Sequence, residues 1–480
     1  MACCSSISPA FLHLRQNPAI KRSKSRTRFQ PISSSLSDPF VLRLAETLED
    51  SFSSDPSPSP SLPLQKLRET SSLSLLSKSW PSSKDEPFRF TDTSFLKSSQ
   101  ILPTSLPPSL SSSPSLPTDT HLPFLTLLDG HVITSLSNLS PLPSPVFVGP
   151  LSNAPSHLST LLLDVLSQFP DGDLFWDLNG VGAPDIAVVY VPAGCRVETP
   201  LHLRFCSWEG TDSESKLLPV SNPRALVLVE EGGEIGIIEE YLGGDGEDKC
   251  YWANSVTEFV IRDGATVRHS YIQRQSSNAS HIKWTFVQQG SSSTYELVET
   301  STGGKLSRHN LHIQQLGSDT VTELSTFHLS GSNQTQDLHS RLVLDHPRGY
   351  SRQLHKCIVT HSSGHAVFDG NVQVNRLAQQ TDAGQLTRSL LMVPRATVNV
   401  KPNLQIIADD VKCSHGAAIS DLEEDQLFYF RARGIDLQTA RNALIFSFGA
   451  EVTDRLPYEP LRKSVQSHLR DLLAAKGAIQ

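Results

Sequence analysis

The stretch from Asp409 to Gly416 places a thiol and an imidazole two residues apart, at Cys413 and His415. If this stretch is extended, both side chains point to the same face, because residues i and i+2 of a strand share a face. A thiolate beside an imidazole can bind iron or zinc, but two ligands do not complete a four-coordinate site. The pattern predicts either half of a metal site that another segment or another chain completes, or a buried thiol beside a hydrogen-bonded histidine.

A second group of possible ligands lies upstream. It consists of His339, His346, His355, Cys357, His361 and His365. His355 and Cys357 would also share a face in a strand. The chain has 17 histidines, so local clusters arise easily, and we expect most of this group to be solvated or structural, with metal binding as the alternative.

The common nucleotide and hydrolase motifs are missing. Gly303-Gly304-Lys305 is followed by Leu306 and lacks the upstream glycine of a phosphate-binding loop. No complete dinucleotide fingerprint, no Gly-x-Ser-x-Gly and no His-Glu-x-x-His occurs. We therefore expect a protein that does not hydrolyse ATP itself, and the common classes of enzyme are removed although an enzyme is not excluded.

The first 37 residues differ in composition from the rest of the chain. They contain six Lys and Arg, many serines and no Asp or Glu. This composition is typical of an organelle transit peptide, and the short, interrupted apolar run around Phe11 is unlike a secretory signal. We predict a plastid transit peptide at residues 1–37, with chloroplast stroma as the destination and an ordinary N-terminal tail as the alternative.

Removal of residues 1–37 would change the formal net charge from -8 to -14. An acidic protein without a stripe of basic and aromatic residues is unsuited to phosphate backbones, so we expect no nucleic-acid partner. No uninterrupted apolar stretch approaches the roughly 18 residues of a membrane helix, so we expect no membrane insertion. The five cysteines beyond residue 37 are widely separated, which indicates a reducing compartment.

Four regions are expected to position the candidate ligands. Residues 38–100 show helical spacing of apolar residues, first around Phe40 to Leu48 and again from Leu62 to Leu76. Residues 101–175 are rich in Pro and Ser, which disfavours helix and central strand, and predict a linker that leads into the core.

Residues 176–416 are expected to form one mostly β core. Short β-branched runs such as Ala225–Val229 alternate with Gly, Asn, Asp and Ser, and no helix pattern interrupts them between about 185 and 408. Sandwich, barrel and solenoid remain open on this evidence, although the length favours a solenoid that grows by stacking turns. We find no repeat of fixed period.

Residues 417–480 return to a helical pattern. Ser420-Asp-Leu-Glu423 predicts a capping box, Gly434 a left-handed stop and Asp436 the cap of a second helix that continues to about Leu456. A final helix is expected from Leu461 to Ala475.

The residues around these motifs resemble the SufD family of iron–sulfur cluster assembly scaffolds. The similarity rests on Trp80-Pro81, His269–Gln273, Ser351-Arg-Gln353, Asp369-Gly370, Gln385, Pro402, Ala408–Gly416, Asp425–Tyr429 and Arg433-Gly-Ile435. It spans about Trp80 to Val452, and the Cys-Ser-His-Gly block distinguishes SufD from its sister scaffold SufB.

The resemblance implies a right-handed parallel β-helix with helical N-terminal and C-terminal regions. It also implies a complex with a SufB-like scaffold and a SufC-like ATPase, in which a cluster forms transiently near the SufB interface and no cofactor is permanently bound. His415, with Cys413 as its neighbour, becomes the candidate cluster ligand. The ATPase would dock on the C-terminal helices, for which we expect Leu427, Phe428, Tyr429, Phe430 and Arg433 to supply contacts.

Two other functions remain to be distinguished from this one. A carbohydrate-active enzyme on a β-solenoid would need clustered acids and usually export. A purely architectural subunit would share the fold and the complex but give His415 no role.

We predict that the N-terminal segment is imported into plastids and cleaved within about ten residues of Ser37, because the first acidic residue is Asp38. N-terminal sequencing of the protein isolated from plastids tests this prediction. Recovery of an intact Met1, or purely cytosolic fluorescence of a tagged chain, would contradict it.

Overall fold

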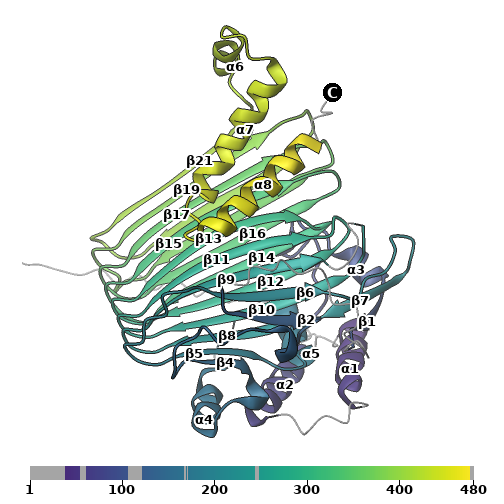
Figure 1. Cartoon of the computed structure of the whole chain (residues 1–480), viewed down its shortest axis with the longest axis vertical. Helices are drawn as coiled ribbons and strands as arrows, with labels where there is room; N and C mark the ends of the chain where they lie inside the picture. Colours follow the sequence, from purple (N-terminus) through teal and green to yellow (C-terminus); the bar gives the residue numbers. More distant parts are fainter. Residues whose placement is uncertain are drawn as a thin grey trace, which may run out of the picture. The chain divides into compact units, whose positions relative to one another are not determined.

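The computed structural model describes residues 38–53, 61–105, 122–166, 169, 171–243 and 248–475. The predicted transit segment, residues 1–37, lies outside the described residues. Helices stand at both ends of the described chain, and strands dominate between them (Figure 1).

The core is a β-solenoid of about seven turns, as the sequence and the resemblance predicted. From β8 to β21, successive strands alternate between two sheets, called A and B below. β7 precedes this series and belongs to sheet A, as β8 does. Sheet A is built from β4 (Phe147–Pro150), β5 (Ala187–Val191), β8 (Arg224–Val229), β10 (Trp252–Ile261), β12 (Ser280–Gln289), β14 (Leu306–Gln315), β16 (Thr335–Leu344), β18 (His365–Val374) and β20 (Thr397–Ile406), with β1 (Gln100–Pro103) and β7 (Leu217–Ser221) beside it.

Sheet B faces sheet A across the interior, which we call the lumen. Its strands are β3 (His131–Val132), β2 (Phe124–Leu128), β6 (Leu201–Ser207), β9 (Glu234–Gly243), β11 (Thr266–Gln275), β13 (Thr294–Gly303), β15 (Val321–Ser330), β17 (Tyr350–Val359), β19 (Asp382–Leu391) and β21 (Lys412–Ser420). Neighbouring strands are parallel throughout the described sheets except for the pairs β2–β3 and β4–β5.

The turns stack without a fixed period. Trp252 lies beside Ser280 in the next turn, and Ser280 lies beside Leu306 in the turn after it. The two steps differ in length, because the loops between strands differ while the ladders stay in register. This variation is the physical reason that the sequence shows no regular repeat.

One corner of the solenoid is nevertheless repeated in backbone conformation. A residue with positive φ stands at the equivalent place in successive turns: Gly194, Gly232, Gly264, Ser292, Asp319, Arg348 and Gln380. The N–H of each donates to a carbonyl in the following turn, for example Gly264 to Ser291 at 2.8 Å and Ser292 to Ser318 at 2.8 Å. Three glycines adopt this conformation without strain, whereas later turns use polar side chains that tolerate it less well.

The lumen has two unlike halves. The half next to this corner is apolar and contains residues such as Ile237, Val267, Leu297, Leu324 and Val372, all nearly inaccessible to solvent. Each turn therefore buries apolar surface only against its neighbours, so the stability of a turn depends on the next one.

The other half of the lumen is polar and fully buried. Glu239 accepts hydrogen bonds from Tyr241 at 2.6 Å and Thr257 at 2.7 Å, and it pairs with Lys283. Burial alone would raise the pKa of the Glu239 carboxyl, but Lys283 and His269 outweigh burial and hold this pKa well below its ordinary value. Two turns further along sheet B, Glu299 lies 2.9 Å from His309 and 2.8 Å from His328.

Helices cover the outer faces of both sheets. At the N-terminal end, α1 (Pro39–Ser53), α2 (Leu62–Leu75) and α5 (Leu174–Gly182) surround an aromatic cluster in which Trp80 contacts Phe175 and Trp252 edge to face. At the other end, α7 (Leu437–Thr453) and α8 (Glu459–Ala475) lie across sheet B, and Ile445, Val452 and Leu469 pack on it. Both predicted N-terminal helices and both later C-terminal helices are confirmed.

The prediction of a linker at residues 101–175 is wrong for most of the region. Strands β2, β3 and β4 belong to the two sheets, and α4 (Ser156–Val165) packs through Leu158, Leu162 and Val165. The prolines flank these short elements instead of interrupting them, and Pro150 ends a strand at the outermost position of sheet A. Residues 106–121 lie outside the described part.

No helix in the described part of the chain is long and apolar enough to cross a bilayer. The cysteines of the described part, Cys195, Cys206, Cys250, Cys357 and Cys413, form no disulfide.

Lys283→Met should leave the Glu239 carboxylate buried without its ammonium partner. Removal of one member of a buried ion pair typically costs about 3–5 kcal/mol, and we expect the free energy of unfolding in urea to fall by about this amount. The free energy of unfolding should fall less in the double variant Glu239→Gln/Lys283→Met than in Lys283→Met.

The matched control is Lys249→Met, which removes an exposed pair with Asp212 and should cost less than about 1 kcal/mol. Equal stability of Lys283→Met and the unaltered chain would show that the buried pair does not stabilise the lumen.

Candidate functional site

Cys413 and His415 lie on β21, the last strand of sheet B. β21 runs parallel to β19, which places Cys413 beside Ala383 and His415 beside Gln385. Ala383 belongs to the apolar half of the lumen. Gln385 is hydrogen-bonded to Gln353 inside the lumen. Both candidate ligands therefore lie on the lumen side of the last turn, and the predicted shared face is confirmed.

The two side chains differ in access to solvent. Cys413 is half-buried against the apolar half of the lumen, and burial raises the pKa of its thiol, an effect that a hydrogen bond with the Ala383 backbone reduces. His415 is exposed. The thiol must lose its proton before it binds a metal, whereas a neutral imidazole can bind at once, so His415 is the readier ligand.

The described residues contain no group of three or more His, Cys, Asp or Glu side chains arranged to hold a metal. This statement covers both candidate regions of the sequence. Cys413 and His415 therefore form at most half of a site within the described chain, and a metal bound there needs ligands from elsewhere.

The strands that end the two sheets are exposed. β20 and β21 are the last members of sheet A and sheet B, and each has a neighbour on one side only among the described strands. They are 10 and 9 residues long, and Ile406 and Ile419 are 45% and 51% exposed. A long, unprotected edge with apolar side chains is unusual in a monomer, because its free N–H and C=O groups invite another strand.

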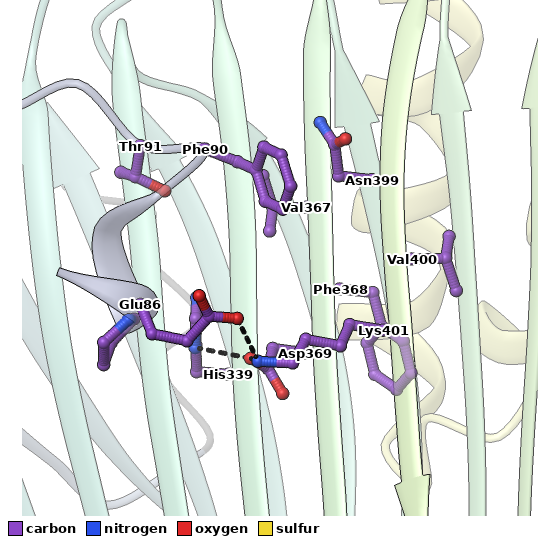
Figure 2. A pocket seen from close by; sticks show the side chains of 11 residues that line it. Glu86, Phe90, Thr91, His339, Val367, Phe368, Asp369, Asn399, Val400 and Lys401 are labelled. Atoms are coloured by element: carbon purple, nitrogen blue, oxygen red, sulfur yellow. Dashed lines mark hydrogen bonds and ion pairs between the residues drawn. The ribbon is translucent and has the colours of Figure 1, made fainter. Parts of the chain in front are cut away.

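A network of ion pairs fixes the N-terminal segment to the same end. Figure 2 shows Lys401 of β20 reaching between Glu86 and Asp369, with Nζ 2.8 Å from Glu86 Oε1 and 3.3 Å from Asp369 Oδ2. His339 Nδ1 lies 3.8 Å from the same Asp369 oxygen, beside a small cavity of about 80 Å³. These charges pair with one another, so the network reads as an anchor for η1 (Glu86–Phe88).

The upstream histidine group is dispersed by the fold. His339 lies on the outer face of sheet A, whereas His355 and Cys357 point into the lumen, which confirms their shared face. His355 Nδ1 is hydrogen-bonded to the Thr326 hydroxyl at 2.8 Å, and its ring stacks on the Phe368 ring. Burial raises the pKa of Cys357 to about 12. These are structural residues of the core.

The predicted capping box at Ser420 is wrong. Ser420 pairs with Leu390 as the last residue of β21, and α6 (Glu424–Arg431) starts after Glu423. The strand continues four residues beyond the predicted boundary at 416, because pairing with β19 outweighs the local helix signal. The predicted stop at Gly434, with φ of 79°, and the cap at Asp436, which accepts from the Thr439 N–H at 3.0 Å, are confirmed.

α6 has no buried residue and lies beyond β21 in Figure 1. Phe428 and Tyr429 are 72% and 55% exposed, and the Arg433 guanidinium lies 3.5 Å from the centre of the Tyr429 ring. Leu427 and Phe430 are half-buried. Phe428 and Tyr429 therefore leave apolar surface that is available to a partner.

Two features of this end were not predicted from the sequence. The Glu86–Lys401–Asp369 network joins residues more than 280 positions apart, and local patterns carry no signal for such a contact. The polar lumen gave a weak signal, because the sequence alone does not distinguish its buried polar residues from solvent-facing ones.

Comparison with known proteins places these features in a family. Residues 211–448 match the model of the SUF system FeS cluster assembly, SufBD core domain. The chain is 59% identical over 96% of its length to "Protein ABCI7, chloroplastic" of Arabidopsis thaliana, 97% of which is covered. The chain belongs to the SufBD family.

Other SufBD family members support the SufD resemblance. A SufBD family protein of Synechocystis is 38% identical over 82% of the chain and 87% of that protein. SufD of Escherichia coli is 30% identical over 62% of the chain and 69% of its own length. The matched core contains β20, β21 and α6, so both predicted sites fall within the part typical of the SufBD family. The carbohydrate-enzyme alternative is thereby set aside.

Proposed function

We propose that this chain is a non-catalytic, SufD-type scaffold subunit for iron–sulfur cluster assembly in the plastid stroma. It pairs with a SufB-like scaffold and binds a SufC-like ATPase. The observation that carries this proposal is the open end of the solenoid, where two unpaired strands expose their edges and Cys413 and His415 face the lumen between them.

The open end suits a second solenoid better than a single peptide. One added strand could pair with β20 or with β21 but would leave the other edge unsatisfied. A second solenoid continues both sheets and covers the last layer of the lumen at once. The SufBD family includes such proteins, and SufB of Bacillus subtilis is 25% identical over 60% of this chain.

The same arrangement gives the cluster a place to form. Cys413 and His415 would lie near the junction, and ligands from the partner chain would complete the coordination that they begin. A cluster held partly by each chain is cargo, which can leave when the chains move apart. No cofactor needs to remain bound to this chain.

The ATPase function is assigned to a partner because the sequence has no phosphate-binding loop. The exposed surface of α6 supplies a docking site for that partner. The plastid assignment is supported by the transit-like composition of residues 1–37 and by the chloroplastic Arabidopsis relative.

The second candidate function is an architectural subunit that supports the complex without ligating the cluster. The described chain supplies no third ligand, and this observation supports the architectural subunit as strongly as it supports a site shared between two chains. The two functions differ only in what the His415 imidazole does.

Phe428→Asp should abolish or strongly weaken capture of the SufC-like ATPase, because it places a charge in the apolar docking surface; we expect at least about a tenfold loss, the equivalent of 1.4 kcal/mol. Co-purification and titration of the ATPase measure the effect. Leu377→Asp is the matched control, since Leu377 is 73% exposed at a loop away from α6. Wild-type binding by Phe428→Asp would refute the docking site.

His415→Ala should leave the complex intact but reduce the iron and acid-labile sulfide it retains after anaerobic reconstitution, and Cys413→Ala should have a smaller effect. Gel filtration checks assembly, and visible absorption follows the cluster. An intact His415→Ala complex with wild-type iron, sulfide and absorption would favour the architectural subunit.

A further inference from the structure

Gln385 is held in one orientation inside the last closed turn of the solenoid. It lies on β19, is 3% exposed, and its Nε2 donates to Gln353 Oε1 at 2.9 Å. Gln353 Nε2 in turn donates to Ser340 Oγ at 2.7 Å on the opposite sheet. The row of bonds crosses the lumen from sheet A to sheet B and assigns the nitrogen of the Gln385 amide to Gln353.

Gly370 makes room for this amide. A Cβ at position 370 would lie 2.4 Å from Gln385 Nε2 and 2.6 Å from the Phe368 ring, closer than side-chain atoms approach. Any larger residue would push the Gln385 amide out of its place. The glycine of the Asp369-Gly370 pair therefore serves the neighbouring layer of the lumen.

The other end of the amide has no partner. Gln385 Oε1 is buried and accepts no hydrogen bond from the described residues. An unpaired buried acceptor costs about 1–3 kcal/mol, so the position is expensive unless another group or a water molecule completes it. The next strand is β21, and the residue paired with Gln385 on that strand is His415.

We propose that Gln385 is the positioning residue for His415: its Oε1 accepts a hydrogen bond from one imidazole N–H and leaves the other ring nitrogen to bind metal. This inference rests on the proposed function, in which a partner covers the open end and buries the exposed imidazole over the lumen. Metal-binding histidines usually donate their second nitrogen to a carbonyl or carboxylate, which fixes both the tautomer and the ring orientation.

The neighbouring Thr387 offers a contrast within the same strand. Its Oγ1 is also buried and without a partner among the described residues, but the paired residue on β21 is Ala417, which has no polar side chain. Thr387 can therefore disturb packing in the last turn without contacting His415.

The test uses three variants in the co-purified complex: Gln385→Leu removes the acceptor, Gln385→Glu keeps one, and Thr387→Val is the packing control. Iron retention is measured by titrating Fe²⁺ in the presence of sulfide. The His415 tautomer is read from solid-state ¹⁵N spectra of histidine-labelled protein, with the His415→Ala spectrum subtracted.

We expect Gln385→Leu to lose the tautomer preference of His415 and to lower iron affinity roughly tenfold, a typical loss for such a supporting contact. Gln385→Glu keeps an acceptor for His415 but loses the N–H that donates to Gln353, so it should keep the tautomer preference of His415 although the turn is less stable. Thr387→Val should stay near the unaltered complex. An unchanged tautomer in Gln385→Leu, or an equal loss in Thr387→Val, overturns the positioning role. If the tautomer changes in Gln385→Leu while His415→Ala retains iron, the contact stands and the proposed ligand role fails.

Discussion

The stacking of each turn on the next is the constraint on which the rest of the structure depends. A turn has a lumen only one layer deep, so its apolar and polar groups are buried by the turns on either side of it. Helices cover the N-terminal turns, but no further strand of the described chain stacks on β20 and β21. The last turn is thus covered on one side only. This explains why its strand edges and His415 are exposed and why Cys413 is only half-buried.

The polar half of the lumen adds a second consequence. Buried groups such as Glu299 and Gln353 must be satisfied within or between turns, and each does so with a side chain one turn away. The network therefore transmits orientation along the axis: Ser340 orients Gln353, and Gln353 orients Gln385. At the open end this order reaches the layer below His415, where a partner would complete the next layer.

The sequence was sufficient to predict the β core, most helices and the shared face of Cys413 and His415, because these depend on local spacing and on capping residues such as Asp436. It was insufficient where tertiary pairing overrode a local signal. Ser420 looked like a helix cap yet pairs with Leu390, and prolines between 101 and 175 concealed strands that begin the sheets. The corner that repeats in each turn could not be found, because Ser292, Asp319 and Arg348 adopt the same conformation as Gly264.

The central claim is that the open end of the solenoid is where another scaffold chain binds. Amide hydrogen exchange of the full chain, alone and with its SufB-like partner, tests it most directly. The account predicts that amides of β20 (Thr397–Ile406) and β21 (Lys412–Ser420) gain protection in the complex, while those of β10 and β12 do not change. Unaltered exchange in β20 and β21 upon complex formation, with protection elsewhere, would contradict it.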